Sequence, residues 1–245
     1  MSYQLPVQKI IVGALFLAWG RKETYLRAIS FPTLILVSIW ALSNYVASSE
    51  SQPLYFLIMV LWGIGFSFFA VTCHRLILIG TDDVYSSFNF RLRIREVKFL
   101  GWILIVYTIV TLAEMVPMTI TMNLNGSYGT ENSSEEFYWL SQIFKIPALY
   151  VLGRLCLVFP ATAVDGKAGL KWSWLITKGN GWRVFVIVGL VPWIFSWLVW
   201  LVWREEATLV EQVLLTLVTY IGLAVEIFML SLTYKELSSE QYKLE

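Results

Sequence analysis

Four charged side chains lie inside long apolar stretches of this 245-residue chain, and they are the groups best placed to do chemistry. They are Glu114, Lys145, Arg154 and Glu226. An isolated charge in hydrocarbon costs several kcal/mol, so such groups pair with one another or face water. Ionisable groups in this setting line ion, proton and ligand pathways, whereas paired groups can also hold neighbouring helices together.

Six apolar stretches must position these charges. Each approaches or exceeds the roughly 20 residues that a helix needs to cross about 30 Å of hydrocarbon. They lie near 25–47, 53–73, 98–120, 138–162, 183–203 and 209–233. The chain is 58% hydrophobic and 14% charged, whereas a soluble domain is usually about 25% charged. The sequence therefore predicts an all-α, polytopic transmembrane helical bundle of six spans, with residues 1–245 forming a single integral membrane domain.

Residues 1–24 precede the first span and contain a shorter apolar run, Ile10–Trp19. This run is too short to cross the bilayer, and no small-residue cleavage pattern follows it. Pro6 suits the start of a helix and Gly20 suits its end. We therefore expect an N-terminal helix over Pro6–Gly20 that lies at the membrane interface.

Basic residues are sorted between alternate connections of the predicted bundle. Segments 1–27, 74–98 and 164–183 are rich in Lys and Arg, whereas 48–52 and 121–137 carry acidic residues and no basic ones. The positive-inside rule then places both termini in the cytoplasm. An even number of spans agrees with this arrangement, because each span reverses the direction of the chain.

The charges within the spans match in depth and sign. At a rise of about 1.5 Å per residue, Glu114 and Lys145 fall at the same depth, outward of the midplane. Arg154 and Glu226 fall together on the inward side. We therefore predict the ion pairs Glu114–Lys145 and Arg154–Glu226, which would make the fourth helix the centre of the bundle. Such pairs either line a polar pathway or ligand site or brace the helices, and the sequence leaves both alternatives open.

Two cytoplasmic connections, near 88–98 and 164–178, carry basic side chains at helical spacing. Trp174 in the second connection indicates a short interfacial helix with a tryptophan anchor. Each basic residue near an anionic membrane surface contributes about 1 kcal/mol of attraction. We therefore predict a basic surface that contacts anionic lipid headgroups or a partner protein. Its residues are Arg91, Arg95, Lys98, Lys167, Lys171 and Lys178.

The remaining residue types give little support for catalysis. His74 is the single histidine of the chain, and one histidine cannot form a haem pair or a histidine-rich metal site. Cys73 and Cys156 fit small buried side chains better than a disulfide framework. No GxSxG, HExxH or P-loop pattern occurs. We therefore expect no enzymatic activity, no metal or other cofactor and no nucleic-acid partner, and we expect His74 to be an interfacial packing residue.

Two classes of function remain. Small soluble parts, little internal polarity and many aromatic residues (12 Trp, 12 Tyr and 15 Phe) favour a non-catalytic accessory subunit of a larger membrane assembly, or an envelope-maintenance factor. This function implies a protein partner in the membrane. The alternative is a small-molecule or lipid transporter that uses the buried ion pairs between helices.

Two segments on either side of the second cytoplasmic connection resemble a known group of proteins. Phe159–Val164 reads Phe-Pro-Ala-Thr-Ala-Val, and Thr177–Arg183 reads Thr-Lys-Gly-Asn-Gly-Trp-Arg. These segments resemble the YciC-like inner-membrane proteins of bacteria, whose function is unknown, and the membrane domain fused to some glycerophosphodiester phosphodiesterases. The resemblance implies a bacterial inner membrane, and it supplies no catalytic residues.

Overall fold

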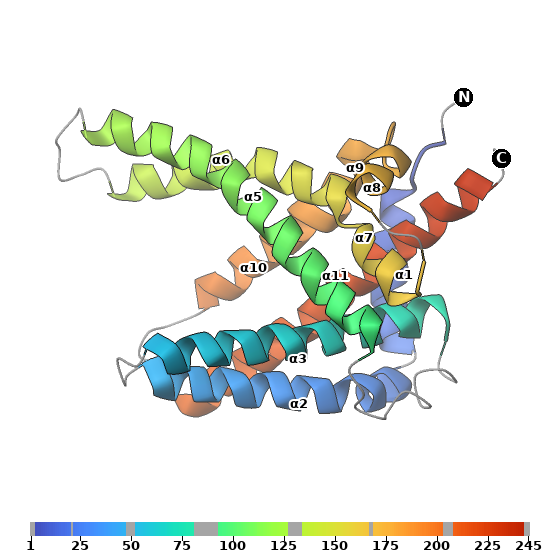
Figure 1. Cartoon of the computed structure of the whole chain (residues 1–245), viewed down its shortest axis with the longest axis horizontal. Helices are drawn as coiled ribbons and strands as arrows, with labels where there is room; N and C mark the ends of the chain where they lie inside the picture. The colour runs from blue at the N-terminus through green and yellow to red at the C-terminus, as the bar shows by residue number, and fades with distance from the viewer. Residues whose placement is uncertain are drawn as a thin grey trace.

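The computed structural model of the chain describes residues 3–20, 22–47, 52–80, 93–126, 134–166, 169–202 and 208–242. Every regular element within these ranges is a helix, so the all-α prediction is confirmed. Apolar runs adopt helices in a membrane because a helix satisfies its backbone hydrogen bonds without water. The long helices together form an elongated bundle (Figure 1).

In chain order the elements are α1 (Val7–Gly20), α2 (Lys22–Ala47), α3 (Gln52–Leu78), α5 (Ile94–Gly126), α6 (Ser134–Leu155), α7 (Val158–Ala163), α8 (Leu170–Ile176), α9 (Gly181–Phe185), a π-helical turn (Val186–Leu190), α10 (Val191–Val202) and α11 (Leu209–Tyr242). Six segments of the described chain are long and apolar enough to cross a bilayer: α2, α3, α5, α6 with α7, α9 with α10, and α11. The six predicted spans are therefore confirmed, and α3, α5 and α11 extend beyond their predicted ends.

The fourth span is interrupted after Leu155 and resumes as α7. Pro160 has no backbone N–H, so the carbonyl of Cys156 lacks the donor that a continuous helix would supply. That carbonyl instead accepts the N–H of Phe159 at 3.1 Å, which tightens the chain at the interruption. Pro160 therefore determines where α6 gives way to α7.

The fifth span changes its hydrogen-bond pattern between α9 and α10. In the π-helical turn, the N–H of Val191 donates to the carbonyl of Val186, five residues earlier. Pro192 follows directly and cannot donate to the carbonyl of Val188, which favours the wider turn at this place. The same proline lies in the wall of two cavities that also contain Glu226 of α11.

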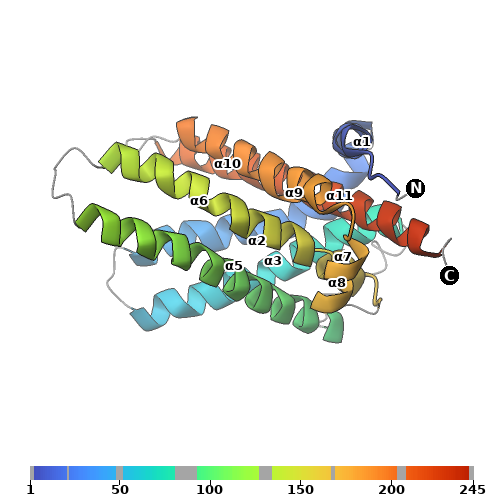
Figure 2. The ribbon, with the colours of Figure 1, turned by 90° about the horizontal axis from the view of Figure 1, so that it is seen from above.

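Helix α1 lies across the bundle rather than along it (Figure 1, Figure 2). It covers Val7–Gly20, which confirms the predicted N-terminal helix, and Ile10 and Ala14 are buried. Both termini lie at one end of the bundle, where Nζ of Lys9 is 3.3 Å from the carboxylate of Glu236. The transverse direction of α1 is the one expected of a helix that lies along a membrane surface.

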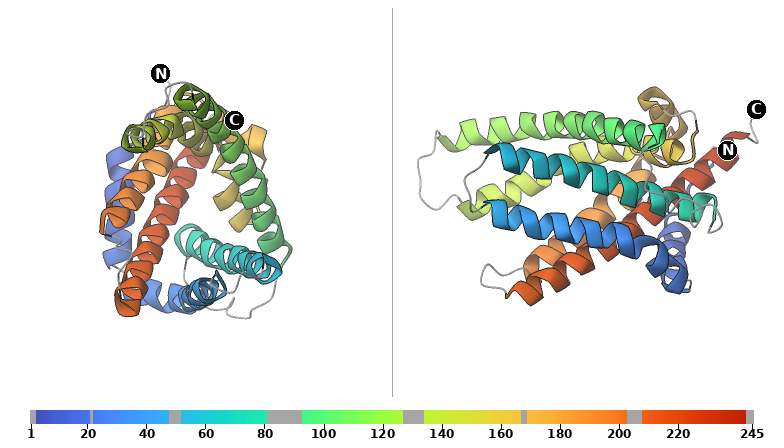
Figure 3. Two further views of the ribbon diagram at one scale, coloured as in Figure 1. Left: turned by 90° about the vertical axis from the view of Figure 1, so that its left-hand side faces the viewer. Right: turned by 60° about the horizontal axis from the view of Figure 1, so that its bottom comes forward.

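The spans form three antiparallel pairs, α2 with α3, α5 with α6, and α10 with α11 (Figure 3). The fourth span is the most enclosed, since 61% of its most apolar window is buried, against 17–39% for the other five. Aromatic contacts join helices near the end that holds the termini: Tyr25 meets Phe228 at 5.1 Å and Phe99 meets Phe159 at 5.2 Å between ring centroids. The core is therefore built around the fourth span.

Candidate functional site

A central cavity of about 210 Å³ lies inside the bundle, between α3, α5, α6, α7, α10 and α11. Its walls are mostly apolar, and His74 and Glu226 contribute an imidazole and a carboxylate. The volume is below the roughly 300 Å³ at which drug-sized pockets begin, so it suits a small apolar molecule or part of an acyl chain. The lining residues are Phe66, Ala70, His74, Phe99, Ile103, Leu152, Cys156, Phe159, Val188, Pro192, Leu223, Glu226, Ile227 and Leu230.

His74 belongs to the α3 wall of the central cavity and is only 1% exposed. Its Nδ1 lies 2.8 Å from Oγ of Ser231, and that hydroxyl donates its single proton to the carbonyl of Ile227. Because the hydroxyl proton is already used, we assign Nδ1 of His74 as the donor in this contact. The imidazole ring also packs against Phe99. His74 is therefore a packing residue, as predicted, and it lies in the protein interior.

A second space, the lateral groove of about 290 Å³, lies between α1, α10 and α11. Glu226 is the one charged residue among the described residues that line it. Glu226 and Pro192 line both the lateral groove and the central cavity, so the two spaces approach each other at this carboxylate. A lone carboxylate in hydrocarbon is costly, so the site favours a ligand that brings a hydrogen-bond donor or a cation to Glu226.

Arg154 does not pair with Glu226, and this prediction is wrong. Its Nε donates to Oγ1 of Thr177 at 2.7 Å. Its Nη1 donates to Oη of Tyr150 at 3.2 Å, and Nη2 donates to the carbonyl of Trp174. The guanidinium also lies over the Trp174 ring, 4.3 Å from its centroid. All of these partners are electrically neutral.

Depth along a helix does not fix the side on which a residue lies, and this explains why Arg154 does not meet Glu226. Leu152 of α6 and Cys156, the residue that follows α6, line the central cavity, whereas Arg154 is two positions from each and lies on the opposite side of the helix. Glu114 and Lys145 are both half-buried on the neighbouring helices α5 and α6. No ion pair joins them among the described residues, so this pairing is also wrong.

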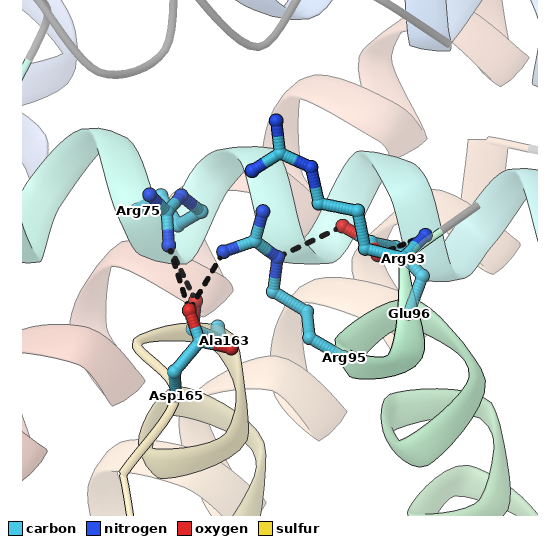
Figure 4. A network of polar contacts seen from close by, with 6 residues as sticks. All are labelled: Arg75, Arg93, Arg95, Glu96, Ala163 and Asp165. Carbon is cyan, nitrogen blue, oxygen red and sulfur yellow. Dashed lines mark hydrogen bonds and ion pairs between the residues drawn. The ribbon is translucent and has the colours of Figure 1, made fainter. Parts of the chain in front are cut away.

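Charged side chains form a network at the end of the bundle that holds the termini (Figure 4). Arg95 donates from Nη1 to Asp165 at 2.9 Å and from Nε to Glu96 at 3.0 Å. Nη1 of Arg75 lies 3.7 Å from the same Asp165 carboxylate and donates to a carbonyl of α7 at 3.1 Å. Glu96 also accepts the backbone N–H of Arg93 at 3.0 Å, which caps the start of α5. The network therefore joins α3, α5 and the chain that follows α7.

The network shows that Arg95 does not belong to the predicted basic surface, and this part of the prediction is wrong. Arg95 is 7% exposed, because its two carboxylate partners hold it inside the protein. It is therefore not available to lipid headgroups or to a partner protein. Of the other predicted members, Lys98, Lys171 and Lys178 are exposed, whereas Arg91 and Lys167 lie outside the described residues.

Asp165 adopts a left-handed backbone conformation, with a φ of 58°. It follows Val164, the C-cap of α7, and its N–H donates to the carbonyl of Thr162 at 3.1 Å. The N–H of Gly166 donates to the carbonyl of Ala161 at 2.8 Å. This is a Schellman ending, in which glycine is the usual residue at the position of Asp165. Any other residue costs about 1 kcal/mol there, and the two arginine contacts of the carboxylate offset that cost.

The Thr-Lys-Gly-Asn-Gly-Trp-Arg segment holds the start of the chain against the bundle. Oδ1 of Asn180 accepts the N–H of Leu5 at 2.8 Å, and Nδ2 donates to the carbonyl of Tyr3 at 3.0 Å. Arg183 donates to Oε1 of Gln4 at 2.7 Å. Asn180 and Leu5 are 175 residues apart in the sequence, so nothing in the local pattern of either segment indicates their contact.

The residues that sequence reasoning missed are polar and belong to turns. Asp165 and Asn180 both follow short apolar segments, where polar residues are ordinarily solvated turn residues. The Gly-Asn-Gly sequence at 179–181 is the one local signal for Asn180, because it marks the turn that ends a short helix. Comparison of the chain with protein-family models, with curated proteins and with solved structures finds no match. The resemblance to the YciC-like proteins therefore stays a prediction.

Proposed function

We propose that this protein is a non-catalytic integral membrane protein that binds an elongated, mostly apolar lipid within its helical bundle, with a hydrogen-bond donor or cationic group of that lipid placed at Glu226. The observation that carries this proposal is the shared wall of the central cavity and the lateral groove at Glu226 and Pro192. An acyl chain that enters from the membrane through the lateral groove can continue along the apolar wall into the central cavity. Packing against side chains holds the acyl chain in place, because its transfer from lipid to the equally apolar protein interior contributes little binding free energy.

The disposition of the ionisable groups supports a binding role rather than catalysis. Nδ1 of His74 is engaged with Ser231, and the Arg95, Glu96 and Asp165 side chains are engaged with one another. Within the described ranges, His, Cys, Asp and Glu side chains do not gather in groups of three that could hold a metal ion. Glu226 is left as the carboxylate that meets a ligand.

The proposed location is the inner membrane of a bacterium, with both termini in the cytoplasm. The orientation is supported by the positive-inside rule, applied to the end of the bundle where both termini lie, and the bacterial membrane is supported only by the resemblance to the YciC-like proteins. The exposed side chains of Lys98, Lys171 and Lys178 belong to connections and helix starts at that end, where they can contact anionic headgroups.

Crosslinking with a lipid that carries a diazirine in its acyl chain tests the ligand proposal. We expect adducts to concentrate on residues 191–195 and 218–229 after irradiation of the protein in liposomes. Val218→Trp fills the lateral groove and should reduce these adducts. Leu214→Trp is the matched control, because Leu214 is exposed on the same helix outside the groove. Uniform labelling of all lipid-facing helices, unchanged by Val218→Trp, would overturn the proposal.

A second candidate is the accessory subunit of a larger membrane assembly or an envelope-maintenance factor. The observation that favours it is the low burial of the first three spans, 22%, 28% and 17% of their most apolar windows. These faces suit neighbouring helices as well as lipid. Mild solubilisation of native membranes, followed by mass spectrometry, should then recover a protein partner in fixed stoichiometry. Migration of the chain alone in native gels would contradict this function.

A further inference from the structure

A polar pocket of about 380 Å³ opens at the end of the bundle that holds the termini, between the N-terminal segment, the end of α6 and the start of α9. We name it the arginine pocket. The lining residues that matter here are Gln4, Tyr150, Arg154, Gly181, Trp182 and Arg183. It shares no lining residue with the central cavity or the lateral groove, so its role does not depend on the function proposed for them.

The arginine pocket has an unbalanced positive charge. Two guanidinium groups line it, and none of the described residues that line it carries a carboxylate. Arg154 is 8% exposed, and its three hydrogen bonds go to a threonine hydroxyl, a tyrosine hydroxyl and a backbone carbonyl. Arg183 likewise donates to two side-chain amide oxygens. Neither cation forms an ion pair with an acidic side chain in the described part of the protein.

The other two buried arginines of the described chain have acidic partners. Arg75 and Arg95 both lie against Asp165, and Arg95 also contacts Glu96. Removing a cation from water is costly unless an opposite charge compensates it. Arg154 lacks that compensation, and an anion bound from outside can supply it. A guanidinium has five N–H donors, so the three hydrogen bonds of Arg154 leave two for such an anion.

The absence of a side chain at Gly181 lets the Arg154 guanidinium and the Tyr150 hydroxyl lie close to the backbone of α9. A Cβ at position 181 would lie 2.6 Å from Oη of Tyr150 and 2.9 Å from Nη1 of Arg154, so any larger residue would displace both groups. Oη of Tyr150 accepts from Arg154 and retains its own proton to donate. The pocket therefore presents donors from two different side chains at one point.

The depth of the arginine pocket is that of lipid headgroups. Arg154 lies in the last turn of α6, toward the terminus-bearing end of an apolar span. Trp182 is 65% exposed and Trp174 is 42% exposed, and both lie beside the pocket on α9 and α8. Exposed indole rings are typical of the boundary between hydrocarbon and water. The anions most abundant at this boundary are lipid phosphates.

We propose that the arginine pocket binds the phosphate of an anionic phospholipid headgroup. Guanidinium groups hold phosphate oxygens through paired, charge-assisted N–H···O bonds, and a tyrosine hydroxyl adds a further donor. The exposed indoles flank the headgroup, and the acyl chains extend along the lipid-facing surface of the bundle. The exposed side chains of Lys171 and Lys178 raise the local concentration of anionic lipid without entering the pocket.

Native mass spectrometry of the full chain tests this site. The protein is reconstituted in nanodiscs of phosphatidylcholine and phosphatidylglycerol, and the lipids retained after release are identified. We expect retention of phosphatidylglycerol in preference to phosphatidylcholine, and affinity about tenfold weaker in Arg183→Gln, which removes one guanidinium. Arg27→Gln is the matched control, because it removes an exposed guanidinium of α2 that does not line the pocket, and it should leave the preference unchanged. Equal losses in the two variants, or equal retention of both lipids by the unaltered protein, would overturn the proposal.

Two further experiments test whether the site needs the planar guanidinium or only its charge, and whether its ligand is a lipid or a soluble anion. Arg183→Lys keeps the charge and loses the planar fork, so we expect it to recover only part of the preference. Inorganic phosphate should not displace phosphatidylglycerol, because the acyl chains hold the lipid in place. Displacement by phosphate would replace the lipid assignment with a soluble anion. Unchanged circular dichroism and thermal unfolding of each variant exclude misfolding as the cause of a loss.

Discussion

Nη1 of Arg95 donates to the carboxylate of Asp165 at 2.9 Å, although the two residues are 70 positions apart in the sequence. The contact joins the first turn of α5 to the left-handed residue that follows α7. The same carboxylate also lies against Arg75 at the end of α3. One residue in a turn therefore connects three helices at the terminus-bearing end of the bundle.

Replacing Asp165 separates the effect of its charge from that of its backbone. Asp165→Ala removes both arginine contacts and keeps the left-handed strain, so we expect the free energy of unfolding to fall by about 1–3 kcal/mol. Asp165→Gly removes the same contacts but relieves the strain, so it should be more stable than the alanine variant by about 1 kcal/mol. Thermal unfolding in detergent, followed by circular dichroism, measures both. Equal stability of the two variants would show that the left-handed conformation does not destabilise the alanine variant.

The hydrogen bond between His74 and Ser231 predicts a coupling between the two residues. Ser231→Ala leaves Nδ1–H of His74 without an acceptor in the protein interior, so we expect a loss of about 1–3 kcal/mol in stability. His74→Phe combined with Ser231→Ala removes both polar groups, and the double variant should lose less than the sum of the single losses. Ser239→Ala serves as the exposed control. Additive losses in the double-mutant cycle would contradict the contact.

Gly153 marks a close approach between α6 and α9. A Cβ at this position would lie 3.1 Å from Cα and 3.2 Å from N of Phe185. Backbone atoms cannot rotate aside as a side chain can, so we expect Gly153→Ala to lower stability by about 1–3 kcal/mol. Gly101→Ala is the control, because nothing lies within 4 Å of its Cβ and alanine favours a helix by about 1 kcal/mol. The prediction fails if the two variants unfold at the same temperature.

The hydrogen bond from the Leu5 N–H to Asn180 predicts that this backbone amide is protected from hydrogen exchange. Asn180→Ala removes the acceptor of the Leu5 N–H, so exchange of that amide with deuterium should become about tenfold faster. Asn180→Asp keeps an acceptor for Leu5 and loses the donor to the carbonyl of Tyr3, so its effect should be smaller. Lys178→Ala should leave the Leu5 amide protected, because its side chain is exposed. Fast exchange in the unaltered protein would contradict the attachment of this segment.

Thiol labelling tests the proposed orientation. Cys73 and Cys156 are free and buried, so the native chain should react little with a maleimide that cannot cross membranes. Thr208 and Lys178 are exposed on opposite sides of the predicted arrangement. We expect Thr208→Cys to be labelled in intact cells and Lys178→Cys only after the membrane is permeabilised. Labelling of Lys178→Cys in intact cells would place the termini outside the cytoplasm.

The sequence by itself determined the class of fold, the six spans and the N-terminal helix. These properties are local, because a helix in hydrocarbon satisfies its backbone hydrogen bonds within one segment, and the length of an apolar run reports whether that segment can span. Pro160 and Pro192 act in the same local way, since each removes one donor from its own helix.

The tertiary structure alone decided which polar groups meet. Depth and sign suggested that Arg154 faces Glu226, but the direction around α6 turns Arg154 toward Thr177 and leaves Glu226 at the junction of two apolar spaces. Arg95 is buried because Asp165 approaches it after α7 has folded back, and no pattern near Arg95 encodes that approach. Side-chain direction depends on how the helices rotate and pack against one another, and this follows from the contacts of the whole bundle rather than from any single segment.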